Sequence, residues 1–478
     1  MPRTGSPRQP RVGRPGGLRG WLSHVTGRSP ARFAVVVFTL LILVFTVLLS
    51  LPAASATHTV TPLSDALFSA VSVVCVTGLS TVDMATHWSL FGHVIIYVGV
   101  QIGGLGVLTI ATMLGTVISR RLGLRAKLLA ASEGNPLRLH RGPVAEGQEV
   151  RLGEVGNLLA TVAISAAVIE AAVAVLLFPR ILAHGRSVTE AIFNSIYFSA
   201  MAFTNTGFTP DPEGLTPYAT DYWFLTVLMA GVFLGAIGFP VLLAFARNLR
   251  ARKKHWSVHV RLTLFAFAIL FVAGGVLYFV LEFDNPHTLA GLGAGDAIYQ
   301  SFFLSAMTRS GGFATIDVGH LNNSSLLITD MLMFIGGGSA STAGGIKVTT
   351  LAVLFLAAVA EAKGDDTMSA FRRTIPHDVL RLAVSVVLWG ATTIAVSTIL
   401  LLNITGQSLD DVLFESISAF ATTGLSTGIT QHLPPLGSYI LSGTMFMGRV
   451  GTVTLAAALA QSQRRQLFHH PEERPIVG

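Results

Sequence analysis

The sequence predicts an all-α polytopic membrane protein in which four M1-P-M2 units (helix, pore helix with filter loop, helix) surround one central pore. Of its 478 residues, 51% are hydrophobic and only 12% are charged, whereas a soluble domain carries about 25% charged residues. Apolar stretches near the roughly 20 residues needed to cross a bilayer recur along the chain. A short pattern ending in x-x-Gly-[Leu/Phe] recurs four times between them.

The first 32 residues contain seven arginines and no acidic residue. Such a composition cannot form a hydrophobic core, so we expect a disordered Arg/Pro-rich cytoplasmic tail. An organelle transit peptide is an alternative with the same composition. The positive-inside rule favours the tail, because basic residues flank the cytoplasmic end of a membrane span. The apolar run Phe33–Leu51 then predicts the first span.

The first unit is expected over residues 33–120. After the first span, a shorter helix begins near Pro62, where Ser64 or Asp65 can cap its free amides. It leads into the filter residues Val76, Thr77, Gly78 and Leu79. A second long apolar run, 90–118, completes the pattern of long helix, short helix, glycine turn and long helix.

The same order recurs over 152–248, 260–362 and 377–463, leaving a C-terminal tail at 464–478. The corresponding turns are Asn205-Thr206-Gly207-Phe208, Ser310-Gly311-Gly312-Phe313 and Thr422-Thr423-Gly424-Leu425. A single copy would indicate an ordinary tight turn. Four copies in equivalent places favour loops around a pore, because glycine adopts φ > 0 and lets carbonyl oxygens face a shared axis. Rings of carbonyls replace the hydration shell of an alkali cation.

A run of small residues interrupts the second long helix of the third unit. Its ten members are Gly336, Gly337, Gly338, Ser339, Ala340, Ser341, Thr342, Ala343, Gly344 and Gly345, with Lys347 close behind. Each glycine weakens a helix by roughly 1 kcal/mol relative to alanine, and non-helical backbone at membrane depth survives only beside protein or water. We therefore expect a mobile gate segment beside the pore. A close helix interface of the Gly-x-x-x-Gly kind is the alternative.

Arg449 lies inside the last apolar run. A charge at that depth costs at least about 2.5–3.5 kcal/mol on insertion scales and normally faces protein or water. Two roles stay open for it: an electrostatic barrier to ions, or a partner for an acid or for carbonyls of the gate segment. Glu415 is assigned to the fourth short helix, whereas Glu170 has no assignment. Gly235 and Gly238 predict a bend in the second unit.

Charge distribution predicts topology. Basic residues gather in the segments that join successive units, which places those segments and both termini in the cytoplasm of a multi-pass plasma-membrane protein. The opposite segments hold mostly acids, which would concentrate cations at the outer mouth. The net charge of +7 follows from this topology, so no nucleic-acid partner is expected. The single cysteine excludes an intrachain disulfide and a cysteine-cluster metal site.

Three stretches together resemble the Trk/Ktr/HKT superfamily of potassium-translocating membrane subunits, most closely the bacterial Ktr type. They are Val76-Thr77-Gly78-Leu79, residues 308–317 and residues 419–428. The resemblance covers about residues 33–478. It implies that the four filter loops select K⁺, since all four signature positions are glycine, and leaves a role for Na⁺ open. It also implies that 336–345 forms an intramembrane gate loop, followed by the family's lysine at Lys347, and that Arg449 lies below the filter.

The resemblance further implies partners. Ktr-type subunits form homodimers on a cytoplasmic ring of nucleotide-binding regulatory subunits, so ATP or ADP is expected on that partner, with no cofactor in this chain. The expected function is channel-like K⁺ influx rather than an enzymatic reaction. A polytopic membrane enzyme would need polar catalytic groups at one depth of the membrane. It is disfavoured because the strongest candidates for such groups, Arg449 and Lys347, are both cationic. A proton- or sodium-coupled secondary transporter with discontinuous helices remains the alternative.

Overall fold

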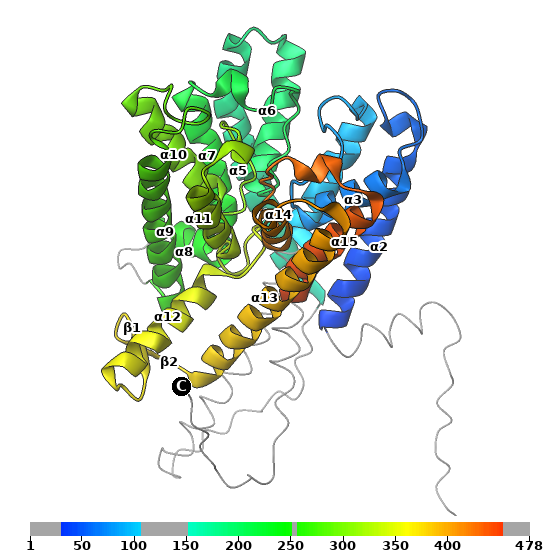
Figure 1. The fold of residues 1–478 in the computed structure, drawn as a ribbon. Coiled ribbons are helices and arrows are strands. Elements are labelled where there is room, and N and C mark those ends of the chain that lie inside the picture. The colour runs from blue at the N-terminus through cyan, green and yellow to red at the C-terminus, as the bar shows by residue number, and fades with distance from the viewer. Residues whose placement is uncertain (1–29, 107–151, 251–255, 453–478) are drawn as a thin grey trace, which may run out of the picture.

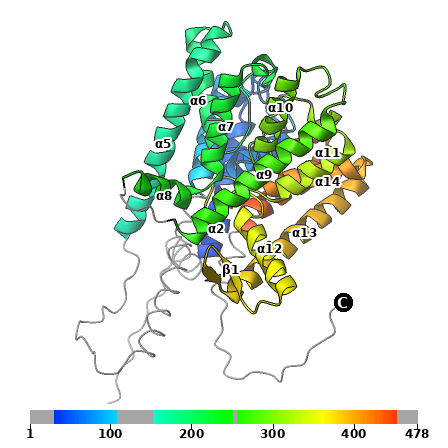
Figure 2. The same ribbon diagram turned by 90° about the vertical axis from the view of Figure 1, so that its left-hand side faces the viewer.

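The computed structural model describes residues 30–106, 152–250 and 256–452, and these form a predominantly helical bundle (Figures 1 and 2). Most of the expected N-terminal tail, the end of the first unit beyond residue 106 and the C-terminal tail 464–478 lie outside the described residues. Helices far apart in sequence pack together, because α3 (Leu63–Cys75) lies against α15 (Pro435–Phe446) as well as α2 (Pro30–Ser50).

The first described stretch contains α2, the 3₁₀ turn Pro52–Ala54, α3 and the helix Leu90–Gly106. The side-chain cap expected at Ser64 or Asp65 is wrong. The helix begins at Leu63 after Pro62, which makes no side-chain cap. Proline's fixed φ suits a helix start, and Asp65 is left free to accept a hydrogen bond from Thr81 Oγ1 at 2.9 Å.

The second stretch contains a bent pair of helices. Its elements are α5 (Leu152–Ala183), α6 (Val188–Phe203), the 3₁₀ turn Thr216–Tyr218, α7 (Tyr222–Ala236) and α8 (Phe239–Arg250). Ser187 and Glu190 form a reciprocal capping box at the start of α6, which satisfies two otherwise free amides. The chain bends by 103° between α7 and α8, and Gly238 between them has φ +94°. The bend predicted from the glycines is confirmed.

The third and fourth stretches follow the same order of helix types. The third contains α9 (Val258–Glu282), α10 (Ala294–Met307), the 3₁₀ turn Val318–His320, α11 (Asn323–Phe334) and α12 (Val348–Lys363). The fourth contains α13 (His377–Thr405), α14 (Leu409–Ala421), the 3₁₀ turn Ile429–His432, α15 and the π-helical turn Met447–Gly451. The predicted helix interruption after residue 335 is present, since residues 335–347 between α11 and α12 are not helical.

A two-stranded hairpin departs from the all-α expectation. Strands β1 (Met368–Ala370) and β2 (Arg373–Ile375) pair antiparallel, with Met368 opposite Ile375. The turn residues Phe371 and Arg372 both have positive φ, which is the geometry of a tight hairpin turn usually signalled by Asn-Gly. Neither residue carries that signal, and Arg261 stacks its guanidinium 5.9 Å from the Phe371 ring centroid instead. The turn therefore has a tertiary contact with Arg261, and the local sequence does not predict it.

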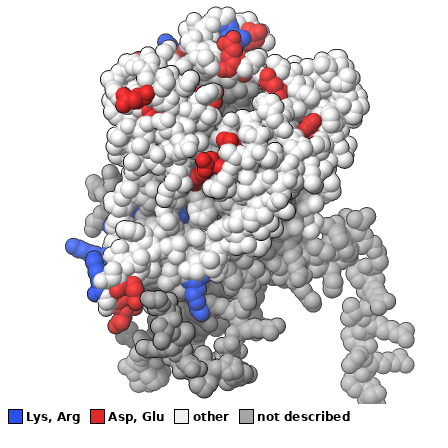
Figure 3. Space-filling view, in the orientation of Figure 1, with Lys and Arg blue, Asp and Glu red and all other residues white. Residues whose placement is uncertain are grey.

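The long helices suit a bilayer. Among the described residues, three helices are long and apolar enough to cross a membrane, or up to four if α7 and α8 are counted as one bent span. Figure 3 shows most visible acidic side chains on the upper half of the molecule, while visible Lys and Arg gather mainly near the lower edge beside one acidic group. This separation fits the charge pattern of the sequence.

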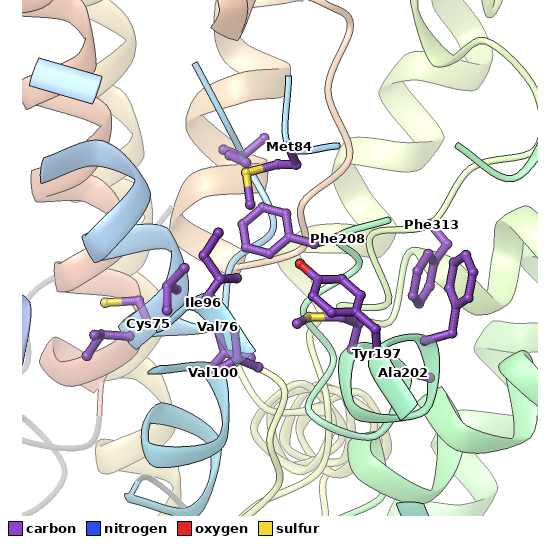
Figure 4. Close-up of a cluster of buried hydrophobic side chains, with 14 of the residues drawn as sticks. Cys75, Val76, Met84, Ile96, Val100, Tyr197, Ala202, Phe208 and Phe313 are labelled. Atoms are coloured by element: carbon purple, nitrogen blue, oxygen red, sulfur yellow. The ribbon is translucent and has the colours of Figure 1, made fainter. Parts of the chain in front are cut away.

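An aromatic and aliphatic core joins the stretches near the filter loops. Figure 4 shows Val76, Val100 and Phe208 close to Tyr197, with Phe313 on the far side. All five are less than 5% exposed. Because full burial of such a side chain contributes roughly 1.5–3 kcal/mol, this cluster fixes the loops relative to one another.

Three acids in the segments opposite the basic ones are buried rather than exposed to solvent. Glu282, Asp211 and Asp221 are at most 5% exposed. Asp221 caps α7 through the Phe224 amide and accepts a 2.7 Å hydrogen bond from Arg180 on α5. Burial opposes ionisation of Asp221, but hydrogen bonds from Arg180, Phe224 and His184 outweigh it and lower its pKa. The carboxylate therefore links α5 to α7 in its ionised form.

We predict that Asp221→Asn lowers the thermal unfolding midpoint of the detergent-solubilised protein by a few degrees at pH 7. A lowered pKa contributes stability above the pKa of the unfolded state, about 3.9 for Asp, and that contribution is lost as pH falls through the folded pKa. The difference between wild type and variant should accordingly narrow below about pH 4. A difference that stays constant with pH would contradict an ionised link.

Candidate functional site

Each of the four predicted filter loops contains two residues in the left-handed region. The first stands two positions before the signature glycine, where φ is +58° at Val76, +61° at Asn205, +69° at Ser310 and +47° at Thr422. The second is the glycine itself, with φ between +71° and +94° at Gly78, Gly207, Gly312 and Gly424. One residue of ordinary φ separates the two. The same backbone conformation is thus repeated in four loops whose side chains differ.

The structure brings the four glycines together in a closed ring. A Cβ atom on Gly78 would lie 1.9 Å from the carbonyl oxygen of Thr206, and one on Gly207 would lie 2.6 Å from the Gly312 Cα. A Cβ on Gly312 would come within 2.7 Å of the Thr423 carbonyl oxygen. The ring closes at Gly424, where a Cβ would lie 2.5 Å from the Thr77 carbonyl oxygen. Each loop therefore touches the next through backbone alone.

Carbonyl oxygens of all four loops lie at this meeting point, from Thr77, Thr206, Gly311 and Thr423. Oxygen dipoles that converge without an intervening side chain can coordinate a desolvated monovalent cation. The residues after the glycines face away into protein, since Leu79, Phe208, Phe313 and Leu425 are at most 3% exposed. A Cβ on Gly311 would face Met307 and Val232, whereas the Gly311 carbonyl oxygen lies 2.8 Å from the Cβ position of Gly207 in the second loop.

The predicted gate segment, residues 336–345, is held by backbone hydrogen bonds. The Gly338 amide donates to the Ala236 carbonyl at 2.8 Å, and the Phe239 amide donates to the Ala340 carbonyl at 2.9 Å. Its two ends meet, because the Gly336 amide donates to the Ile346 carbonyl at 2.8 Å. The segment therefore packs against the backbone at the bend between α7 and α8. A side chain on Gly338 would collide with the Ile237 carbonyl oxygen, at 2.4 Å.

The segment also touches the start of three filter loops. Thr342 Oγ1 lies 3.0 Å from the Phe203 carbonyl oxygen and 2.6 Å from Asn205 Oδ1. The Gly344 amide donates to Ser310 Oγ at 3.4 Å, and a Cβ on Gly344 would lie 2.1 Å from Thr422 Oγ1. Ser310 Oγ in turn donates to the Thr422 carbonyl at 2.6 Å. Ser341 and Ala343 are buried, with a 3.5 Å hydrogen bond between them. Ser339 instead bonds to Thr349 of α12 at 2.9 Å.

Two cations hold the segment's carbonyls. Lys347 Nζ donates to Ala343 at 2.6 Å and to Gly344 at 3.3 Å. Arg449, 2% exposed, donates through Nη1 to the Thr342 carbonyl. It stands in the π-helical turn, an irregularity frequent at functional sites. Gly337 and Gly345 complete the segment, with φ +65° at Gly345. Of the two roles open for Arg449, pairing with carbonyls of the segment is the one supported by a direct contact, the hydrogen bond to Thr342.

Sequence reasoning missed Arg309 and gave Glu170 no role. Arg309 is fully buried just before the third filter loop and donates to the Ile335 carbonyl at 2.9 Å, where α11 ends. Arg309 could have been found from the sequence, because an arginine among apolar and small residues requires a partner. Glu170 of α5 accepts a 2.6 Å hydrogen bond from Gln101 and links α5 to the helix Leu90–Gly106.

Comparison with known proteins identifies the family. Residues 18–467 match the family described as TrkH, cation transport protein. The chain belongs to this family. It is 34% identical to the Ktr system potassium uptake protein D of Bacillus subtilis, covering 94% of this chain and 97% of that protein. It is 29% identical to the potassium/sodium uptake protein NtpJ of Enterococcus hirae, with the same two shares covered. The resemblance to the Trk and Ktr proteins is confirmed.

A solved structure supports the fold of this TrkH family member. The potassium transporter TrkH from Vibrio parahaemolyticus superposes with a TM-score of 0.67 at 19% identity, covering 87% of this chain and 83% of that chain. Among the described residues, no group of three or more His, Cys, Asp or Glu could hold a metal ion. The carbonyl oxygens at the meeting point of the four loops are the predicted ion ligands.

Proposed function

We propose that this chain is the ion-translocating subunit of a potassium uptake system, with four M1-P-M2 repeats around one pore. The observation that carries the proposal is the closed ring of four glycine loops with a shared backbone conformation. The names of its potassium uptake relatives support K⁺ as the transported ion. Sodium is the second candidate, as a transported or modulating ion, because one relative is named for both.

Flux through such a pore runs down the electrochemical gradient. The membrane potential contributes about 2.3 kcal/mol per charge per 100 mV, so inward movement of K⁺ needs no hydrolytic chemistry in this chain. We place the protein in the plasma membrane with both termini cytoplasmic, on the positive-inside pattern of its basic residues. A proton- or sodium-coupled secondary transporter is the alternative, and dependence of uptake on external pH would favour it.

The segment 336–345 is the proposed gate. It contacts the beginnings of three filter loops and is held through Thr342 and Ala343 by Arg449 and Lys347. Small residues allow such a segment to move with few side-chain contacts to rearrange. We propose that a homodimer of this chain is regulated by a cytoplasmic nucleotide-binding ring. The Ktr system names of its relatives support a multi-subunit system.

We predict that Gly78→Ser lowers the ratio of K⁺ to Na⁺ flux in liposomes by roughly tenfold, equivalent to about 1.4 kcal/mol between the ions. The new Cβ would displace the Thr206 carbonyl. Gly185→Ser is the matched control, because Gly185 has φ +84° with nothing within 4 Å of its Cβ position. An unchanged ratio in Gly78→Ser, or an equal fall in Gly185→Ser, would count against the filter.

We predict that Thr342→Val raises basal K⁺ flux several-fold. Valine keeps the shape of threonine but loses the hydroxyl that contacts the Phe203 carbonyl and Asn205, so the gate segment is released from the second filter loop. Thr342→Ser keeps the hydroxyl and should stay near the wild-type flux. Lower flux in an assembled Thr342→Val protein would show that this contact supports conduction.

Replacement of Arg449 separates its two candidate roles. Arg449→Ala should raise basal flux, because the Thr342 carbonyl loses its donor and the gate loses a fixed positive charge. Glutamine is a neutral donor, so Arg449→Gln should retain low flux if hydrogen bonding holds the gate. High flux in both variants would instead assign control to the charge. Size-exclusion profiles check that each variant still assembles.

A further inference from the structure

Every pore helix turns at least one polar side chain toward the segment that follows its own filter glycine. In the first three loops this side chain makes a single hydrogen bond to that segment, and we call the pair a brace. The pairs are Asp65 with Thr81 at 2.9 Å, Asn194 with Asp211 at 3.4 Å, and Gln300 with Thr315. The fourth brace is Glu415 of α14, and it differs in both burial and number of contacts.

Glu415 is fully buried. Its Oε1 accepts from Ser426 Oγ at 2.5 Å, the Thr427 amide at 3.0 Å and Thr427 Oγ1 at 3.4 Å. Its Oε2 accepts from Thr430 Oγ1 at 2.6 Å. A buried carboxylate is tolerated only when it is hydrogen-bonded in this way. The four donors all come from residues 426–430, so one side chain fixes the whole outer segment.

The same helix also holds the fourth filter loop directly. Ser418, one turn after Glu415, donates to the Leu425 carbonyl at 2.6 Å and accepts from the Thr423 amide through its own carbonyl at 2.9 Å. The clamped segment supports the third unit as well, because a Cβ on Gly319 would lie 2.6 Å from the Thr427 carbonyl oxygen. Gly424 is therefore fixed on both sides by contacts that originate on α14.

We propose that Glu415 is a positioning residue for ion selection, an inference that rests on the proposed filter. Glu415 contacts no ion site, and it acts by restricting the backbone of Thr423 and Gly424. Selection among alkali cations depends on the number of coordinating carbonyls and on how freely they move. Release of the fourth loop would let its carbonyls approach the smaller Na⁺, so Na⁺ flux rises relative to K⁺ flux.

The test compares Glu415→Val with Glu415→Gln in the full-length protein in liposomes. Valine removes all acceptors, and we expect the K⁺ to Na⁺ flux ratio to fall about tenfold. Glutamine keeps one oxygen for Ser426 and Thr427, while its amide can donate to the Thr430 hydroxyl. The K⁺ to Na⁺ flux ratio of Glu415→Gln should stay within about threefold of the wild-type ratio. An unchanged ratio in assembled Glu415→Val overturns the proposal.

Glu282→Val is the matched control. Glu282 is also fully buried and accepts from Asn285, Thr288 and the Asn322 amide at 2.6–2.9 Å, yet its bonds do not reach a filter loop. We expect Glu282→Val to lower the thermal midpoint and leave the flux ratio unchanged. If it lowers the ratio as much as Glu415→Val does, general destabilisation explains both and the positioning role is refuted.

A second variant covers the case in which Glu415→Val does not assemble. Ser426→Ala combined with Thr430→Val removes two donors and leaves α14 intact, so the ratio should fall in the same direction by a smaller factor. No change would overturn the proposal. Gly424→Ser tests the filter separately: if it lowers the ratio while the Glu415 variants do not, only the positioning role fails. If Gly424→Ser also has no effect, the filter itself fails.

Discussion

The backbone contact among four filter loops is the constraint on which the rest of the structure depends. A Cβ atom at Gly78 or Gly424 would come within 2.5 Å of a carbonyl oxygen of another loop, a distance that real side chains do not tolerate. The loops must therefore be supported from behind, by the pore helices and by the buried residues that follow each glycine. Helices such as α3 and α14, whose C-caps are left-handed, deliver the chain directly into that geometry.

The left-handed residues before the glycines show how much support is required. Val76 and Thr422 are β-branched, and a left-handed conformation costs such residues roughly 1–2 kcal/mol. Strain of this size persists only where surrounding packing determines the backbone. Val76 is fully buried in the core of Figure 4, and the Thr422 carbonyl accepts a hydrogen bond from the Ser310 hydroxyl. Packing energy from the bundle thus maintains four unfavourable backbone conformations at one place.

Sequence patterns predicted the helical class and the positive φ of the four glycines, because hydropathy and repeated glycine are local signals. They did not predict the left-handed Val76, Asn205, Ser310 and Thr422, since no residue type there demands positive φ. The hairpin turn at Phe371 and Arg372 was hidden for the same reason. Arg309 and the four bonds of Glu415 depend on residues that become neighbours only after folding, so their roles required the structure.

The two cations at the gate segment differ in what they join. Lys347 follows the segment after one intervening residue, and its bonds reach back three and four residues to Gly344 and Ala343. Arg449 comes from the fourth stretch and binds Thr342 across 107 residues of sequence. If the segment moves as a unit, the Lys347 bonds can move with it, whereas the Arg449 bond must break or stretch. In the proposed gating scheme, Lys347 therefore maintains the shape of the segment, and Arg449 sets its position relative to the filter loops.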